Sequence, residues 1–372
     1  MERILHIPGG ILNRNSGVAS FLMNIYKNIN REKFQFDFIA FTNEKGEYED
    51  EILQLGGRVY HVERPGRNLI KNMIQTYKLM KQYPYNIMHR HTAEAQCWTD
   101  FYLAKRAGIV HRVAHSHGIH TYKPKLHNFF YPIMIANITG RVACSKDAGQ
   151  WLFHDNSSFI VIKNGIQTSK FMFSDKLRTE QRKSLGISDN TLLLGSVGRL
   201  ANPKNPFMTV KVFAALEKKY PNCKLVILGE GDLRNQVEVL IHDLNVDDKV
   251  ILPGVTSEVT KWMCAMDVGI YPSEFEGFPF SIIEGETNGL PTVMSDRITK
   301  EVDILGSIIS ISLKKSPDVW ADAILHMYQA NKTLSRGECA KIVFQAGYDI
   351  KNAARDLENY YEKLLQNNQQ RN

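Results

Sequence analysis

Short apolar segments alternate with amphipathic helical segments along almost the whole chain, and this order constrains the fold more than any other feature. The first apolar segment, Arg3–Ile7, ends in Pro8-Gly9-Gly10, and from Gly17 onward the apolar residues recur at helical spacing. Repeated strand–helix–strand order favours parallel sheets that are covered by helices on both faces. The sequence therefore predicts an α/β protein.

The expected elements fall into two groups of similar size. Strands are expected at Arg3–Ile7, Phe34–Phe38, Arg58–Val62, Asn86–His89, His111–His115, Arg141–Cys144 and Phe159–Lys163, then at Leu192–Val197, Lys224–Leu228, Val250–Leu252, Val268–Tyr271 and Thr292–Met294. Helices are expected from Gly17 and at Asn68–Tyr83, Glu94–Ala107, Pro206–Lys219, Leu233–Leu244, Ser257–Ala265, Ser281–Asn288 and Ile350–Leu365. Each group has the alternating order of strands and helices that one Rossmann-like domain contains.

The chain has 372 residues, which suits about two domains. The Asn164-Gly165 turn after the strand at 159–163 marks a boundary, so domains are expected at 1–163 and 164–349, with the helix 350–365 packing back on the first. Two such domains would face each other across a cleft, with the ligand at the C-terminal ends of the strands.

Charge divides unevenly between the two expected domains. Residues 1–163 hold 21 Lys and Arg against 13 Asp and Glu, a net of +8, whereas residues 164–372 hold 25 against 26, a net of −1. The first domain is therefore expected to meet an anionic partner, either a phosphate or an anionic membrane surface. Nucleic acid is disfavoured because the chain has no Lys/Arg-rich run, no ribonucleoprotein motif and no zinc-finger spacing.

The remaining composition favours the cytoplasm. Five cysteines, odd in number and far apart, suit a reducing compartment and form no Cys-x-x-Cys metal site. The sequence shows no apolar run of transmembrane length and no signal-peptide pattern. We therefore expect a cytoplasmic protein that is in part peripheral at the inner face of the cell membrane.

Two glutamates stand eight residues apart around a predicted helix start. Glu276 lies in a Gly/Pro-rich loop after the strand 268–271, and Glu284 lies on the helix that follows. Carboxylates are good acceptors for neighbouring sugar hydroxyls, so the pair is suited to two sugar rings of one ligand. The alternative is two solvated glutamates at a helix start, where acidic residues are common.

Two cations follow the strand 192–197. Arg199 and Lys204 flank a Pro-containing loop after Gly198, and a helix comes next. Arg binds phosphate as a fork and Lys as a point charge, so this pair is suited to a diphosphate; the alternative is a solvated basic loop. The glycine patterns of a nicotinamide dehydrogenase and of a P-loop ATPase are both absent from the sequence.

Histidines gather at the end of a strand in the first domain. His115 and His117 stand on one side of the strand end, and His89 and His91 follow the same spacing one strand earlier. A metal site is one interpretation, disfavoured because no Cys or carboxylate accompanies the histidines at ligand spacing. A hydrogen-bonded structural histidine and a residue facing the cleft are the others.

In this order and spacing, the segments resemble the family 4 retaining glycosyltransferases of the GT-B fold, and most of all those of bacterial exopolysaccharide and capsule synthesis. The resemblance covers Gly9-Gly10, His115-Ser-His-Gly118, Val161–Ile166, Val197-Gly-Arg-Leu with Pro203-Lys-Asn, Leu228-Gly-Glu-Gly231, Leu252-Pro-Gly-Val255, and Glu276 through Glu284 to Gly289-Leu-Pro291. It implies an enzyme that moves a hexose or N-acetylhexosamine from a nucleotide-diphosphate sugar, expected to be a UDP-sugar, to a saccharide acceptor.

The resemblance also implies roles for individual residues. His117, Glu276, Arg199 and Lys204 would be catalytic, with His117 and Glu276 at the donor sugar and the two cations at its diphosphate. The full set of expected donor-binding residues is Gly17, Arg199, Lys204, Pro253, Gly254, Val255, Glu276, Gly277, Phe278, Pro279 and Glu284, with Glu284 on the ribose. Glu286 and Asn288 depart from the small residues usual in the family.

The expected chemistry needs no cofactor and no metal. The chain contains no Asp-x-Asp motif to hold a cation, so Arg199, Lys204 and helix N-termini are expected to stabilise the charge on the leaving diphosphate. Two alternatives stay open: a nucleotide-sugar 2-epimerase, which needs no acceptor, and a non-catalytic sugar-nucleotide-binding subunit.

The acceptor is expected to be lipid-linked, because the segment 122–135 joins Lys123 and Lys125 to aromatic and apolar residues, a composition that suits a membrane interface. The alternative is that Phe129, Phe130 and Ile133 are core residues of a helix packed on the sheet.

Overall fold

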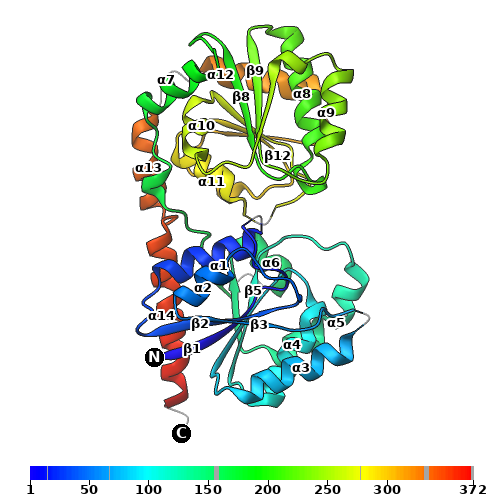
Figure 1. The fold of residues 1–372 in the computed structure, drawn as a ribbon, viewed down its shortest axis with the longest axis vertical. Helices are drawn as coiled ribbons and strands as arrows, with labels where there is room; N and C mark the ends of the chain where they lie inside the picture. Colours follow the sequence, from blue (N-terminus) through cyan, green and yellow to red (C-terminus); the bar gives the residue numbers. More distant parts are fainter. Residues whose placement is uncertain (15, 67, 155–158, 277, 331–334, 370–372) are drawn as a thin grey trace. The chain divides into compact units, whose positions relative to one another are not determined.

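The computed structural model describes residues 1–14, 16–66, 68–154, 159–276, 278–330 and 335–369. The chain forms two compact units, Met1–Gly165 with Ile350–Asn372 and Ile166–Asp349 (Figure 1). Each unit contains one sheet in which all paired strands run parallel, so the predicted class of two parallel-sheet α/β domains is confirmed.

The N-terminal unit holds a seven-stranded sheet in the order β3-β2-β1-β4-β5-β6-β7. Its strands are β1 Glu2–Ile7, β2 Phe34–Ala40, β3 Arg58–His61, β4 Ile87–Thr92, β5 His111–Ser116, β6 Gly140–Ala143 and β7 Ile160–Val161. Its helices are α1 Gly17–Asn28, α2 Glu49–Gln54, α3 Leu69–Gln82, α4 Trp98–Ala107, α5 Pro124–Asn137, α6 Lys146–Phe153 and α14 Ile350–Gln369.

The C-terminal unit holds a six-stranded sheet in the order β10-β9-β8-β11-β12-β13. Its strands are β8 Leu192–Val197, β9 Cys223–Leu228, β10 Val250–Gly254, β11 Val268–Tyr271, β12 Thr292–Ser295 and β13 Ile308–Ile311. Its helices are α7 Asp175–Ser184, α8 Pro206–Lys219, α9 Arg234–Asp243, α10 Val259–Ala265, α11 Phe280–Thr287, α12 Pro317–Ala330 and α13 Arg336–Gln345.

In each sheet the strand order reverses beside the unit's first strand, between β1 and β4 and between β8 and β11. Loops leave the two strands of such a pair in opposite directions, which opens a crevice at their carboxyl ends. The two reversals therefore mark where each unit can take a ligand.

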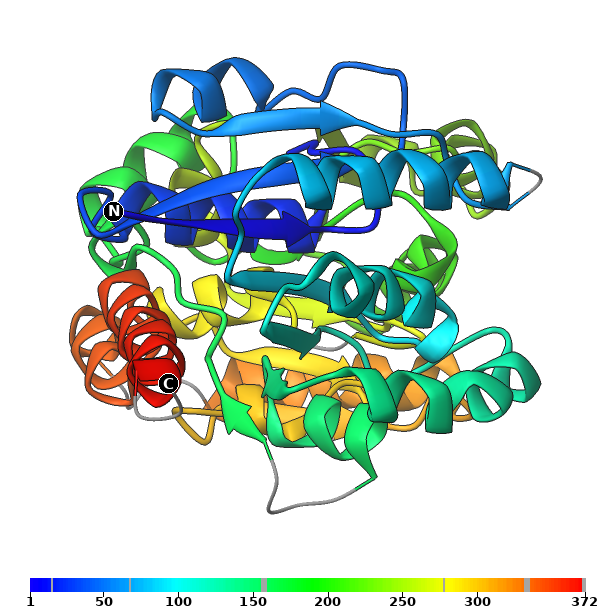
Figure 2. The ribbon, with the colours of Figure 1, turned by 90° about the horizontal axis from the view of Figure 1, so that it is seen from below.

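The two faces of the N-terminal sheet are covered differently. Helices α3, α4 and α5 lie side by side over one face, the blue-to-teal helices in front of the sheet in Figure 2. An apolar cluster that includes Leu5, Met88, Phe101 and Met134 fills that layer. On the other face α14, the C-terminal helix, packs against α1.

Helix α5 turns one apolar side to the sheet and another to solvent. Phe130 packs on the Trp98 ring, with centroids 5.7 Å apart, and joins the apolar cluster. Phe129 is 68% exposed and Ile133 36% exposed. The interpretation of these three as core residues therefore holds for Phe130 and is wrong for Phe129 and Ile133.

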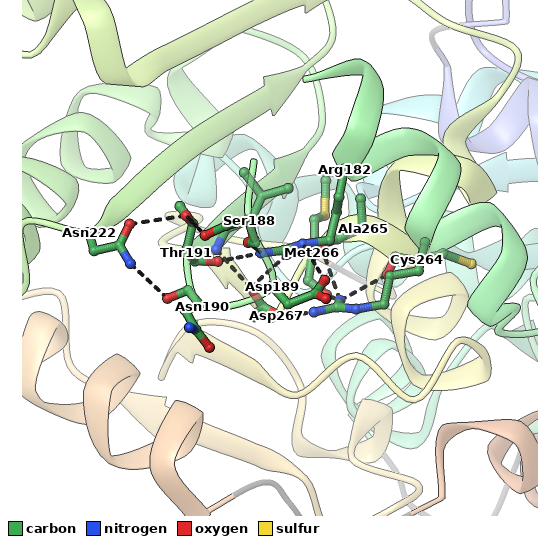
Figure 3. A network of polar contacts seen from close by, with 12 residues as sticks. Arg182, Ser188, Asp189, Asn190, Thr191, Asn222, Cys264, Ala265, Met266 and Asp267 are labelled. Atoms are coloured by element: carbon green, nitrogen blue, oxygen red, sulfur yellow. Dashed lines mark hydrogen bonds and ion pairs between the residues drawn. The ribbon is translucent and has the colours of Figure 1, made fainter. Parts of the chain in front are cut away.

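Helix α7 is held to the C-terminal sheet by polar contacts. Arg182 is buried and donates to the Ala265 and Ser188 carbonyls at 2.8 and 2.6 Å and to Asp267 Oδ2 at 3.1 Å (Figure 3). Asp267 also accepts from the Leu193 amide at 2.8 Å and from Arg178 at 2.6 Å.

The same polar character explains why the sequence pattern did not predict α7. Its only apolar side chain is Leu177, so the sequence has no apolar periodicity that predicts this helix. Helices α2, α6, α12 and α13 and strand β13 were also not predicted. In α12 the buried Trp320, Ala321, Ile324 and Met327 do follow the helical period.

We expect Arg182→Met to lower the free energy of unfolding by about 3–5 kcal/mol, because it leaves buried carbonyls and part of the Asp267 carboxylate without a donor. Arg178→Met is the matched control. Arg178 is more exposed, and its loss leaves Asp267 paired with Arg182. Urea unfolding measures both, and an equal or larger loss in Arg178→Met would contradict this account.

Candidate active site

Loops that follow β8 and β11 lie side by side at the carboxyl edge of the C-terminal sheet, where the strand order reverses. Arg199 and Lys204 follow β8, and Ser273 and Glu276 follow β11. The Glu274 amide donates to the Pro203 carbonyl at 2.9 Å, which joins the two loops directly. The predicted cations and one predicted glutamate therefore lie at one place in the fold.

Lys204 and Glu276 form an ion pair. Lys204 Nζ lies 2.5 Å from Glu276 Oε2, and Ser273 Oγ donates to Glu276 Oε1 at 2.7 Å. The Lys204 side chain is 27% exposed and that of Glu276 10%. Lys204 and Ser273 thus fix the orientation of the carboxylate, a role for Ser273 that no sequence pattern indicated.

Arg199 differs from Lys204 in having no compensating carboxylate. Its side chain is exposed and makes no ion pair or hydrogen bond within the described part of the chain. A small pocket lies beside it, and the residues that line it include Gly198, Lys204, Tyr271 and Ser273. An anion at this pocket would contact Lys204, which is paired with Glu276, and Arg199, which has no carboxylate partner among the described residues.

The ends of β9 and β10 complete this edge. The Gly229 amide donates to the Gly254 carbonyl at 3.0 Å, and the Gly198 amide donates to the Leu228 carbonyl at 2.9 Å. Gly229 has φ +138° and a Cβ there would lie 2.1 Å from the Gly198 carbonyl oxygen, so only glycine fits. Pro253 and Val255 are exposed, and Gly254 between them is buried.

Glu284 lies on α11 and is partly exposed, and its carboxyl makes no hydrogen bond within the described residues. Burial raises the pKa of its carboxyl to about 7, and the charge of Lys170 opposes that rise. A desolvated carboxyl with its acceptor positions unused is able to receive two hydroxyl donors from a ligand.

Glu286 and Asn288 do not line this edge as free groups. The Glu286 carboxylate accepts from the Ile304 and Leu305 amides at 2.9 and 2.8 Å and from Ser307 Oγ at 2.9 Å. The Asn288 side chain donates to the Phe171 carbonyl at 3.0 Å and accepts from Arg336. The two departures from the family pattern therefore stabilise loops of the unit.

The remaining predicted donor-site residues have distinct settings. Phe278 is buried and stacks on Tyr348, with ring centroids 5.4 Å apart, and Pro279 is the cap residue of α11. Gly277 lies outside the described residues. Gly17 opens α1 in the N-terminal unit, and a Cβ there would meet no other atom, so the backbone is open to a ligand.

His117 follows β5 in the N-terminal unit and is partly exposed. Its Nε2 lies 2.8 Å from His91 Nδ1, and the fold adds His6 from β1, whose Nδ1 lies 3.1 Å from His91 Nε2. Sequence analysis named His89, His91, His115 and His117 but missed His6. The register that pairs His6 with His89 and His91 with His115 was the missing information.

Two family profiles match the chain, one in each unit. "Glycosyltransferase Family 4" matches residues 15–170, and "Glycosyl transferases group 1" matches residues 178–337. EpsF of Bacillus subtilis, named as a glycosyltransferase, is 30% identical over 375 residues, which cover 97% of this chain and 96% of EpsF. The chain belongs to the family 4 glycosyltransferases.

Other proteins similar to this glycosyltransferase give the same result. An Escherichia coli protein named UDP-Gal:alpha-D-GlcNAc-diphosphoundecaprenol alpha-1,3-galactosyltransferase is 29% identical over 281 residues, covering 70% of this chain and 72% of that protein. The Anabaena protein HepE, crystallised with UDP and glucose, has a TM-score of 0.79 at 16% identity, covering 97% of this chain and 100% of HepE. The fold is GT-B.

We expect Glu284→Gln to be more stable than the wild type only at higher pH. The carboxyl contributes its full stability below its unfolded pKa, 4.5, and loses it as the pH rises through about 7. Gln cannot ionise, so the difference in the free energy of unfolding should grow between these values.

Glu286→Gln is the matched control, two residues away. Burial raises the pKa of Glu286 to about 7 as well, but its carboxylate accepts three hydrogen bonds. Two of these bonds share Oε2, which the Gln oxygen replaces, while the Gln NH2 group donates to Ser307 Oγ. This variant should therefore gain stability relative to the wild type over the same pH range. Urea unfolding across the pH range measures both, and a Glu284→Gln curve parallel to that of the wild type would contradict the burial of Glu284.

Proposed function

We propose that this glycosyltransferase is a retaining enzyme that transfers a hexose or N-acetylhexosamine from a UDP-sugar to a lipid-linked saccharide. The observation that carries the proposal is the edge described above, where an uncompensated Arg199, the Lys204–Glu276 pair and the desolvated Glu284 gather at the β8/β11 reversal. The UDP bound to HepE and the lipid-diphosphate acceptor in the name of the E. coli relative support the two substrate classes. A Salmonella typhi relative named as a Vi polysaccharide biosynthesis protein supports a place in bacterial cell-surface polysaccharide synthesis.

Different residues are proposed to bind the diphosphate, the sugar, the ribose and the base of the donor. Arg199 binds the diphosphate with a fork of donors, and Lys204 reaches the same phosphates while it holds Glu276. Glu276 accepts hydroxyls of the transferred sugar, and Glu284 accepts the two ribose hydroxyls. The backbone of Pro253–Val255 contacts the base.

The reaction breaks the bond between C1 of the sugar and the phosphate oxygen, and the electron pair stays with the diphosphate. The acceptor hydroxyl oxygen bonds to C1 from the same face, and its proton passes to the leaving phosphate oxygen. Arg199 and Lys204 stabilise the charge that develops there, in positions fixed before the reaction. His117 is proposed as a hydrogen-bond donor to the sugar.

We expect Arg199→Ala and Lys204→Ala to fail in different ways. Arg199→Ala should weaken UDP binding roughly tenfold to hundredfold, the effect of one charge-assisted contact. Lys204→Ala also releases Glu276, so its kcat should fall further than its UDP affinity. Calorimetry with UDP and a transfer assay in excess EDTA measure both; unchanged UDP binding in both variants would remove the diphosphate assignment.

The same assay separates the alternatives. Conversion of the nucleotide-sugar without any acceptor would show an epimerase, and UDP-sugar binding without conversion would show a non-catalytic subunit. A loss of transfer in EDTA that Mg²⁺ or Mn²⁺ restores would contradict metal-independent transfer.

The acceptor is proposed to reach the enzyme from an anionic membrane surface, at what we call the α5 face: Tyr122, Lys123, Lys125, Leu126, Phe129 and Ile133. All six side chains are exposed, and Ile70 and Ile74 on α3 are exposed as well. Within the described residues no helix is long and apolar enough to cross a bilayer.

We expect Lys123→Glu with Lys125→Glu to weaken binding to anionic liposomes at least tenfold at low salt, because each cation near such a surface contributes about 1 kcal/mol. Lys211→Glu with Lys218→Glu on α8 changes the net charge equally and should have little effect. Co-sedimentation measures both pairs. Equal losses in the two pairs would show a response to net charge alone, and a wild type that ignores anionic liposomes would end the proposal of a membrane-side acceptor.

A further inference from the structure

One face of the N-terminal sheet buries imidazoles where a protein of this class would bury aliphatic side chains. His6, His89, His91 and His115 are at most 2% exposed, and Tyr361 of α14 is fully buried against them. The rings stack closely, with His89 and His91 centroids 4.5 Å apart and those of His115 and His117 4.1 Å apart. Burial lowers the pKa of His6 and of His117 to about 3, so these rings are neutral at physiological pH.

The five imidazoles and the phenol make one unbranched series of contacts. His117 Nε2 lies 2.8 Å from His91 Nδ1, and His91 Nε2 lies 3.1 Å from His6 Nδ1. His6 Nε2 lies 3.5 Å from the Tyr361 hydroxyl oxygen, which lies 2.6 Å from His89 Nδ1. His89 Nε2 lies 3.1 Å from His115 Nδ1, where the series ends.

Every contact between two rings joins an Nδ1 to an Nε2. A neutral imidazole carries one proton, so each ring donates through one nitrogen and accepts through the other. A ring that accepts on one side must donate on the other, and the tautomer of each ring therefore fixes that of the next. All five contacts run in one direction when all five rings carry their proton on Nδ1, or when all five carry it on Nε2.

The ends of the series decide between these two states. His115 Nε2 is buried and has no hydrogen-bond partner among the described residues, whereas His117 at the other end is partly exposed. With the protons on Nε2, His115 would hold a buried N–H with no acceptor, a defect rarer in proteins than an unused acceptor. If both neighbours of Tyr361 donated to it instead, its own buried O–H would have no acceptor.

We propose that the five histidines and Tyr361 form a single hydrogen-bonded chain with every ring in the Nδ1–H tautomer, which presents His117 Nδ1–H as a fixed donor at the carboxyl edge of the sheet. His91, His6 and Tyr361 are then positioning residues for His117. This hydrogen-bonded chain lies wholly within the N-terminal unit. Only the use of His117 as a donor to the substrate rests on the proposed function.

The hydrogen-bonded chain of histidines disfavours a metal site at these residues. The ligand atoms of His6, His89 and His91, and those of His91, His115 and His117, lie within 4.8 Å of one another. A cation held by three imidazoles needs three converging lone pairs. In the Nδ1–H chain every lone pair except that of His115 Nε2 accepts a proton from its neighbour, so one remains.

Long-range ¹H–¹⁵N spectra of the ¹⁵N-histidine-labelled protein test the proposal directly, because protonated and unprotonated ring nitrogens resonate far apart. The expected result is Nδ1–H for His6, His89, His91, His115 and His117, assigned through single-histidine variants. A mixture of tautomers, or Nε2–H throughout, overturns the proposal. So does stoichiometric binding of added Zn²⁺ that His115→Gln abolishes.

Tyr361→Phe divides the chain and makes a selective prediction. Without the phenol, His89 and His115 hold one orphaned N–H in either direction, so both should become tautomer mixtures. His6, His91 and His117 avoid an orphaned N–H only as Nδ1–H and should stay so. Tyr360→Phe is the control, since this neighbouring hydroxyl is buried and has no partner among the described residues. Mixed tautomers in both variants, or in neither, contradict the chain.

Transfer kinetics test the use of the chain. His91→Phe frees His117 to take either tautomer and should lower kcat about tenfold, the effect of one hydrogen bond. His89→Phe leaves the segment from His117 to Tyr361 intact and should preserve both the His117 tautomer and kcat. Equal losses in the two variants contradict positioning by the chain. If the wild type shows Nδ1–H throughout but transfers no sugar, the proposed function fails and the proposal of the hydrogen-bonded histidine chain still holds.

Discussion

Both sheets of this glycosyltransferase are parallel and covered by helices, and the site depends on that constraint. A strand buried on both faces has no solvent for a polar side chain, so such a side chain must be paired inside or placed at a strand end. Strand β2 shows the first solution: Asp37 is fully buried and accepts from Arg3 at 2.5 Å and from Tyr85 at 2.8 Å. The loops after β8 and β11 show the second solution, because Arg199, Lys204 and Glu276 lie beyond the strand ends.

The two units use the carboxyl edge in different ways. The C-terminal unit places charged groups there, and Lys204 orients the Glu276 carboxylate through their ion pair. The N-terminal unit places neutral imidazoles there and extends them into the interior. Because the buried rings are neutral, they bring hydrogen-bonding capacity into the core without the desolvation of a charge.

Two neighbouring glutamates of α11 show how a fold separates similar residues. Glu286 has two backbone amides and a hydroxyl to accept, and it fixes the segment between β12 and β13. The Glu284 carboxyl has no such donors among the described residues, so its acceptor positions are unused. Burial raises the pKa of both carboxyls, so the pKa alone does not distinguish the hydrogen-bonded glutamate from the one without donors.

The amino-acid sequence by itself determined the class of fold, most strands and the loops that carry the site. Period-two and period-3.6 patterns and strand-end glycines are local features, and they place Arg199, Lys204, Glu276 and Glu284 correctly on their elements. It did not reveal α7, because that helix is stabilised by the buried Arg182 and has no apolar period.

Only the tertiary structure decided which side chains meet. The Lys204–Glu276 pair spans 72 residues, and the contact of His89 with Tyr361 spans 272. Such pairs depend on strand order and register, which no local pattern contains. The sequence shows histidines at alternate positions of two strands, but pairing β1 with β4 and β4 with β5 and packing α14 over them makes five separate imidazoles one chain.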